Sequence, residues 1–191
     1  MTDPLDTSAA RPSSAPSERQ VRWVYLVGRP LGALVAGDLA EARRQTGLDL
    51  PEFFVSDRAR GLWRRRFDQV TAEPESAPWL ARAAVSEPDG AVVGYAGFHG
   101  PPDESGMVEI GYTVVPEARR RGYARAMLAS LLERAAHEPD VSTVRVTISP
   151  DNAASLATIQ GFGFVETGEQ MDEEDGLEII FEVPADHILG S

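Results

Sequence analysis

The chain contains no cysteine, and this absence excludes several kinds of site. Disulfides, thiolate nucleophiles and cysteine-rich zinc sites all require that side chain. Histidine is scarce too: His99, His137 and His187 are the three in the sequence, and they lack close ligand spacing. We therefore expect no metal site, and the redox compartment stays undetermined.

Long apolar runs and basic charge are also missing. No stretch approaches the length of a bilayer, and the first residues lack the apolar run of a signal peptide, so we expect a cytoplasmic protein without a membrane partner. The formal net charge of −12 argues against nucleic-acid binding, which needs a basic excess. An acidic protein instead attracts cations, which favours a cationic amine as partner.

The composition that remains is that of one globular domain with an extension. Of 191 residues, 42% are hydrophobic and 25% are charged. Residues 1–20 are rich in Pro, Ser, Ala and Thr, which predicts a disordered tail. We expect a single domain over residues 21–191, as a monomer or a homodimer.

The hydrophobic pattern alternates between strand and helix periods. It predicts a strand from Val21, helices over 34–46 and from Ser56 or Asp57 to about Val70, and a meander of strands over 79–86, 91–99 and 106–115. It then predicts a helix over about 120–137, a strand over 142–149, a short helix capped by Asn152 or Asp151, and a hairpin of 164–171 with 177–183. The fold class is mixed α/β (α+β), a mostly antiparallel sheet with a central βαβ crossover whose two strands are parallel.

The segment "PEARRRGYA" connects the strand and the helix of this crossover. Free amides at a helix amino end, together with the helix dipole, attract anions. Gly122 has no Cβ, so the backbone can approach phosphate oxygens closely. Cations at a helix amino end oppose the dipole unless an anion is bound there, so the arginine run indicates an anion site rather than a solvated basic face.

Two motifs resemble those of the GCN5-related N-acetyltransferase (GNAT) superfamily. "EIGYTVVPEARRRGYARAML" resembles its central motif, with Arg119, Gly122 and Ala124 at the [RQ]-x-x-G-x-[GA] positions. "NAASLATIQGFGFVETG" resembles the next motif, where an asparagine is followed by Gly-Phe. Ser155, with no tyrosine after it in this motif, is most similar to the ribosomal-protein acetyltransferase (RimJ/RimL-like) branch.

The resemblance implies acetyl-CoA as co-substrate and two parallel strands that splay apart. It places the pyrophosphate on the amides of the turn, which are those of Arg120, Arg121, Gly122, Tyr123, Ala124 and Arg125, and includes Arg119 and Asn152 in the cofactor site. It places the pantetheine arm along the strand edge at Thr113, Val114 and Val115, where an amide near Thr113 would polarise the thioester carbonyl.

Acetyl transfer to an amine needs a base, because amines with a pKa of ~8 to ~10.4 are mostly protonated at pH 7. The resemblance gives this role to Glu109, whose simpler interpretation is a strand glutamate in an ion pair. Many relatives use a tyrosine as the acid at the position of Ile159. Ser155 is the family-guided substitute, although it is equally a polar residue of a first helical turn.

Other candidates have weaker support. Tyr112 alternates onto the strand face opposite Glu109, Tyr123 occupies a common turn position, and we interpret His99 as a structural histidine. The acidic loop Asp172, Glu173, Glu174 and Asp175 either recruits a cationic acceptor or is a solvated hairpin loop. Phe53, Phe54 and Trp63 line an acceptor pocket or, as the stronger expectation, pack in the core.

The sequence thus predicts an acetyl-CoA-dependent N-acetyltransferase that transfers the acetyl group directly to a primary amine in a ternary complex, since no cysteine can carry it. The amine belongs to a small molecule or to a protein amino terminus. The alternative is a non-catalytic acyl-CoA-binding regulatory module, which the missing tyrosine at position 159 favours.

Overall fold

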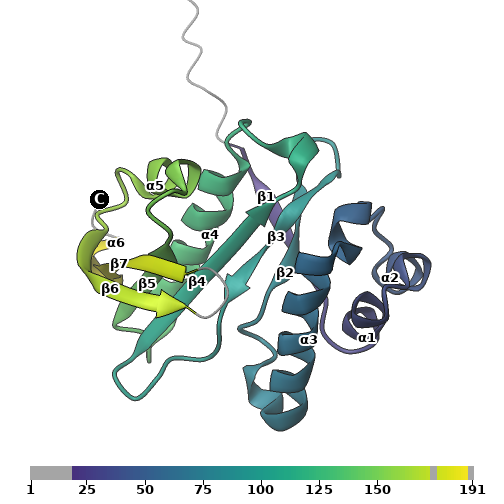
Figure 1. Ribbon diagram of the computed structural model, residues 1–191, viewed down its shortest axis with the longest axis horizontal. Helices are drawn as coiled ribbons and strands as arrows, with labels where there is room; N and C mark the ends of the chain where they lie inside the picture. Colours follow the sequence, from purple (N-terminus) through teal and green to yellow (C-terminus); the bar gives the residue numbers. More distant parts are fainter. Residues whose placement is uncertain (1–18, 173–175, 189–191) are drawn as a thin grey trace, which may run out of the picture.

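The protein is built on one twisted, seven-stranded sheet, shown in Figure 1. The computed structural model describes residues 19–172 and 176–188. The strands are β1 (Val21–Tyr25), β2 (Arg82–Ser86), β3 (Val92–Phe98), β4 (Met107–Val114), β5 (Thr143–Ile148), β6 (Val165–Asp172) and β7 (Gly176–Pro184), in the order β1-β2-β3-β4-β5-β7-β6. Neighbouring strands are antiparallel except β4 and β5, which confirms the predicted fold class.

Helices flank this sheet in two groups. Figure 1 shows α1 (Arg29–Ala36), α2 (Leu39–Thr46) and α3 (Asp57–Ala72) together on one side, and α4 (Tyr123–His137) with α5 (Ala153–Ile159) on the other. The short α6 (Ala185–Ile188) follows β7. No helix within 19–172 or 176–188 is long and apolar enough to cross a membrane.

The helix predicted over 34–46 is wrong, because the chain forms two helices there. Gly37 ends α1 in the left-handed conformation at φ 77°, which favours glycine. Asp38 then starts α2, where its side chain accepts a hydrogen bond from the amide of Glu41. The prediction for α3 holds, with the Ser56 hydroxyl accepting from the Ala59 amide as an N-cap.

Three other predicted boundaries also shift. The helix expected from residue 120 begins at Tyr123, since Arg120 and Gly122 adopt positive φ and cannot be helical. The strand expected from residue 79 begins at Arg82. Gln20, assigned to the tail, accepts a hydrogen bond from the amide of Glu87, so the last residues of that segment contact the domain.

The parallel strands β4 and β5 separate partway along their length. They pair at Met107 with Thr143, Val108 with Val144 and Glu109 with Arg145, and at no later position within the described chain. Beyond that point β4 continues against β3, while β5 continues against β7. The sheet therefore opens beyond Glu109, between two strands that remain anchored on their outer sides.

Candidate active site

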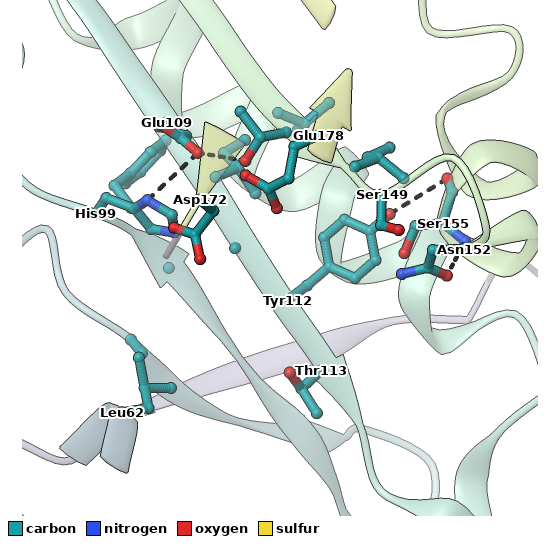
Figure 2. A pocket seen from close by; sticks show the side chains of 18 of the residues that line it. Leu62, His99, Glu109, Tyr112, Thr113, Ser149, Asn152, Ser155, Asp172 and Glu178 are labelled. Atoms are coloured by element: carbon teal, nitrogen blue, oxygen red, sulfur yellow. Dashed lines mark hydrogen bonds and ion pairs between the residues drawn. The ribbon is translucent and has the colours of Figure 1, made fainter. Parts of the chain in front are cut away.

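A cavity of about 1070 Å³ occupies this opening. Figure 2 shows side chains that line it. Its walls come from α3, from β3 and β4, from β5 with the start of α5, and from β6 and β7. Because it is lined by residues of both sheet faces, including Glu109 and Tyr112, it connects the α3 side with the α5 side. Groups that alternate onto opposite faces of β4 therefore share one cavity.

Only alternate residues of β4 present their backbone groups to the opening. The amide of Val115 donates to Val93 O at 3.0 Å, and the amide of His99 donates to Glu109 O at 2.8 Å. Since hydrogen-bonding direction alternates along an antiparallel strand, the odd-numbered residues bond to β3. The backbone groups of Tyr112 and Val114 therefore face the gap. The prediction that the backbone of Val114 lies at this open edge agrees with the register, whereas the same prediction for Thr113 and Val115 is wrong, because their backbone groups point to β3.

The turn between β4 and α4 has free backbone donors. Arg120 and Gly122 have φ of 56° and 86°, alternating with residues of negative φ, a pattern that gathers successive amides into an anion-binding concavity. No side chain caps α4, and its first turn has no acidic residue. Within the described residues, no amide of residues 120–125 donates a hydrogen bond to the protein.

The side chains of this turn are largely committed to the protein itself. Arg119 Nε donates to Val114 O at 3.2 Å, and Arg125 Nη1 donates to Gln160 O at 2.7 Å. Tyr123 is buried, with its hydroxyl 3.1 Å from Ser86 Oγ. The guanidinium of Arg121 lies 5.6 Å from the Tyr123 ring, and that of Arg19 lies 5.5 Å from it. Arg19, which the sequence assigned to the tail, thus adds a cation beside the turn.

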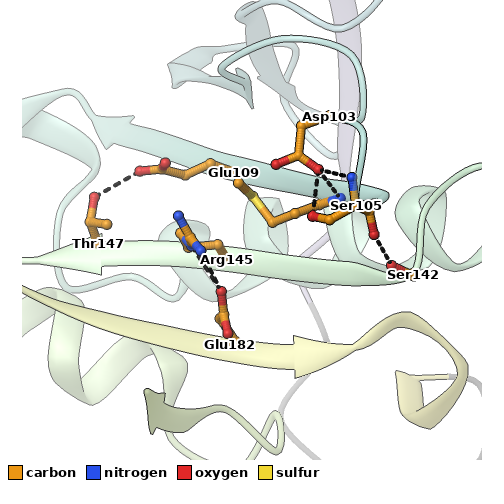
Figure 3. Close-up of polar contacts among 8 residues, drawn as sticks. Asp103, Ser105, Glu109, Ser142, Arg145, Thr147 and Glu182 are labelled. Carbon is orange, nitrogen blue, oxygen red and sulfur yellow. Dashed lines mark hydrogen bonds and ion pairs between the residues drawn. The ribbon is translucent and has the colours of Figure 1, made fainter. Parts of the chain in front are cut away.

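Glu109 lies where β4 and β5 separate. Its side chain is 18% exposed, and its Oε1 accepts a hydrogen bond from the Thr147 hydroxyl at 2.8 Å. Arg145 occupies the paired position on β5 but donates to Glu182 Oε1 from Nε at 2.9 Å and from Nη2 at 2.7 Å, as Figure 3 shows. The carboxylate of Glu109 therefore keeps an oxygen for the cavity.

His99, interpreted from the sequence as a structural histidine, also lines the cavity. Its Nδ1 lies 3.5 Å from Glu109 Oε1. Although 46% of its side chain is exposed, that surface faces a concave cavity, and desolvation together with the charge of Arg66 lowers the pKa of His99 to about 4. Gly111 permits the approach, because a Cβ there would lie 2.9 Å from His99 Nε2. That glycine was the available sequence signal.

On the α5 side, three predicted residues meet. Asn152 Oδ1 accepts from the Ser155 amide at 3.1 Å and so caps α5, while the Tyr112 hydroxyl donates to Ser155 O at 3.5 Å, as Figure 2 shows. Burial raises the pKa of Tyr112, which keeps its hydroxyl protonated at neutral pH. Ile159, which replaces the usual tyrosine, is 6% exposed in the core.

The aromatic residues suggested for an acceptor pocket lie elsewhere. Phe54 and Trp63 are fully buried, and neither they nor Phe53 line the cavity, so core packing is the correct interpretation. The helix α3 instead contributes Arg58, Leu62, Arg65 and Arg66 to the wall.

The acidic hairpin is described only in part. Asp172 lines the cavity, and Glu173, Glu174 and Asp175 lie outside the described residues. No group of His, Asp and Glu in the described chain is arranged to hold a metal ion.

Comparison with known proteins identifies relatives of this chain. An uncharacterized N-acetyltransferase, YjdG, of Bacillus subtilis (strain 168) is 36% identical over 74 residues, which cover 39% of this chain and 44% of the relative. An L-2,4-diaminobutyric acid acetyltransferase of Streptomyces anulatus is 35% identical over 95 residues, 49% of this chain and 48% of the relative. The chain thus matches about half the length of these relatives, or less.

The fold and the family are supported over a larger part of the chain. A chimera of the spermidine N-acetyltransferase SpeG from Vibrio cholerae and hSSAT superposes with a TM-score of 0.63 at 12% identity, covering 92% of this chain and all of that one. At this identity the likeness shows the fold alone. The family model of the acetyltransferase (GNAT) domain matches residues 40–165, which include β4, the turn, α4, β5 and α5. The chain therefore belongs to the GNAT acetyltransferase domain family.

Proposed function

We propose that this protein is an acetyl-CoA-dependent N-acetyltransferase that transfers the acetyl group directly to a primary amine in a ternary complex. The observation that carries the proposal is the cavity through the β4–β5 gap, which joins Glu109 on one side with Tyr112 and Ser155 on the other. A strand edge with free backbone groups borders the same gap and leads into a turn with free amides. These features suit a long, extended co-substrate with an anionic end.

The described residues suit two parts of acetyl-CoA, its pyrophosphate and its pantetheine arm. The free amides of residues 120–125, at an uncapped helix amino terminus, would hold a pyrophosphate, with the charge of Arg120, Arg121 and Arg19 nearby. The backbone of Tyr112 and the amide of Val114, whose carbonyl already accepts from Arg119, would hold an amide-containing arm as an added strand holds its neighbour. When bound, acetyl-CoA supplies an acetyl thioester.

Glu109 is the proposed base. An attacking amine must lose a proton, and a carboxylate held at the cavity wall by Thr147 can accept it directly or through a water. His99 is neutral at pH 7 because its pKa is lowered, so its ring adds no positive charge beside the carboxylate of Glu109.

The proton donor for the departing thiolate comes from the α5 side. Ser155 is the residue that the family resemblance suggests, and it lines the cavity. The Tyr112 hydroxyl lies beside it and stays protonated at neutral pH, so it takes the place of the tyrosine missing at position 159. We propose that Tyr112 and Ser155 deliver the proton together.

The names of the relatives do not decide the acceptor, because one acts on an amino acid and another on a polyamine. Both a small-molecule amine and a protein amino terminus remain candidates. Membership of the RimJ/RimL-like branch, a cationic acceptor and a cytoplasmic location remain predictions.

A paired binding and turnover measurement tests the function. Acetyl-CoA should raise the melting temperature in a saturable way, since a ligand at about 100 times its Kd adds about 2.7 kcal/mol to the free energy of unfolding. Release of free thiol should then require an added amine. The chain has no lysine, so self-acetylation is confined to its amino terminus and gives little background.

The two results separate the competing functions. No thermal shift at millimolar acetyl-CoA would overturn the cofactor assignment. Binding without thiol release across amino acids, polyamines, aminoglycosides and short basic peptides would identify the non-catalytic acyl-CoA-binding module instead.

A further inference from the structure

The α3 wall of the cavity is positively charged although the chain as a whole is acidic. Arg58, Arg65 and Arg66, which we call the arginine wall, all line the cavity. Residues 58, 65 and 66 are spaced by about two helical turns, which places them on one face of α3. The net charge of −12 would attract cations to the protein as a whole, but this wall of the cavity repels them.

Arg66 is the best-fixed member of the arginine wall. Its Nη1 donates to Gln69 Oε1 at 2.9 Å and to the carbonyl of His99 at 3.0 Å. Its Nε is buried and has no hydrogen-bond partner. Burial and then the neighbouring Arg65 lower the pKa of Arg66 to about 10, while the charge of Glu109 opposes this shift, so the guanidinium remains charged at neutral pH. A fixed, desolvated cation that lacks one acceptor is suited to bind an anionic group.

The facing wall carries the opposite charge. Glu109 of β4, Asp172 of β6 and Glu178 of β7 line it, and Figure 2 shows them grouped around His99. We call these residues the carboxylate wall. Arg66 and Arg65 lower the pKa of His99 while Glu178 raises it, so His99 lies within electrostatic reach of both walls. The two charges of a small molecule can therefore bind on either side of this histidine.

We propose that the acceptor is a small amine that also carries a carboxylate, an amino acid in the broad sense, with its carboxylate on the arginine wall and its amine toward Glu109. This inference rests on the proposed acetyl transfer and names the substrate class of the same site. A polyamine would place a second cation against the arginine wall, which is electrostatically unfavourable. An acceptor without a carboxylate would lack this attraction to the arginine wall.

Matched acceptors test the proposal on the full chain. Ornithine is compared with 1,4-diaminobutane, and lysine with 1,5-diaminopentane and lysinamide, by release of free thiol from acetyl-CoA. Because each pair differs in the carboxylate or its charge, we expect kcat/KM to be higher for the amino acid by about tenfold or more. A diamine, spermidine or a short basic peptide preferred over every amino acid would overturn the proposal and leave acetyl transfer standing. No product from any amine would instead contradict the proposed function.

Variants of α3 locate the carboxylate. Arg66→Gln should raise KM for the preferred amino acid by about tenfold or more and change kcat/KM for the matched diamine far less. Arg64→Gln is the control, since Arg64 is exposed on α3 and does not line the cavity. If Arg66→Gln does not fold, Arg65→Glu serves instead and should shift the preference toward the diamine. An unchanged ratio of amino acid to diamine in a folded variant of this wall overturns the placement.

Discussion

Glu109 and Arg145 occupy the last paired positions of β4 and β5, yet the guanidinium of Arg145 bonds to Glu182 and not to Glu109. Glu182 is paired with Arg145 across β5 and β7, so the three residues lie side by side on one sheet face. The choice of partner keeps Glu109 available to the cavity. A carboxylate neutralised by arginine would be a poor proton acceptor.

The first prediction concerns this choice of partner. Glu182→Gln should release Arg145 toward Glu109 and lower kcat by about tenfold or more, although residue 182 does not line the cavity. The double variant Arg145→Gln, Glu182→Gln should recover most of the lost rate. Steady-state kinetics of the two variants test this prediction. If kcat of the double variant stays as low as that of Glu182→Gln, the effect of Glu182 does not act through Arg145.

The second prediction tests Glu109 itself. Glu109→Gln keeps an oxygen that can accept from Thr147, so the fold and acetyl-CoA binding should be retained. Loss of the base should lower kcat by about 10² or more at neutral pH. Thr147→Val is the matched control, which removes the hydrogen bond but keeps the carboxylate and should have a smaller effect. An unchanged rate for Glu109→Gln would remove Glu109 from the mechanism.

The third prediction concerns the proposed proton donors on α5 and β4. Tyr112→Phe and Ser155→Ala should each lower kcat by about tenfold or more with little change in acetyl-CoA affinity. Because Tyr112 and Ser155 are in contact, we expect the losses to be non-additive in the double variant. Fully additive losses in a double-mutant cycle would mean that the two hydroxyls act independently.

The fourth prediction separates backbone strain from cofactor binding at Gly122. Gly122 has φ 86° and Gly90 has φ 69°, and neither has a close neighbour that a Cβ would strike. Alanine at either position should cost about 1 kcal/mol in the free energy of unfolding, because both need the left-handed conformation. Calorimetry should show weaker acetyl-CoA binding for Gly122→Ala alone. Equal affinities in the two variants would refute the placement of the pyrophosphate.

The fifth prediction follows from the environment of His99. Folding lowers its pKa from 6.5 to about 4, chiefly by desolvation and then by Arg66, so the unfolded chain binds more protons between these values. The stabilising contribution of neutral His99 is thus present above pH 6.5 and is lost as the pH falls toward 4. His99→Asn should flatten the decline of the melting temperature across this window. An NMR titration of the ring with a midpoint at or above 6.5 would contradict the assignment.

Many helices and strands were predictable because each is specified by residues close together in the sequence, such as a helix cap or an alternation of apolar and polar residues. Ser56 before a helical period, the period-2 strands of the meander and Asn152 before α5 each specify an element through neighbouring residues. The helix over 34–46 failed for a local reason as well, since Gly37 and Asp38 form a stop and a start within one apolar period.

The sequence by itself determined the family, the turn at Gly122 and the candidacy of Glu109, because spacing along a strand and a turn survives in the chain order. The tertiary structure decided which atoms face the cavity. Strand register turned the backbone of Tyr112, rather than that of Thr113, toward the gap, and side-chain competition gave Arg145 to Glu182. Packing of α3 brought Arg66 against His99. Such contacts join residues far apart in sequence, and their partners are fixed only when the sheet and helices close around the same space.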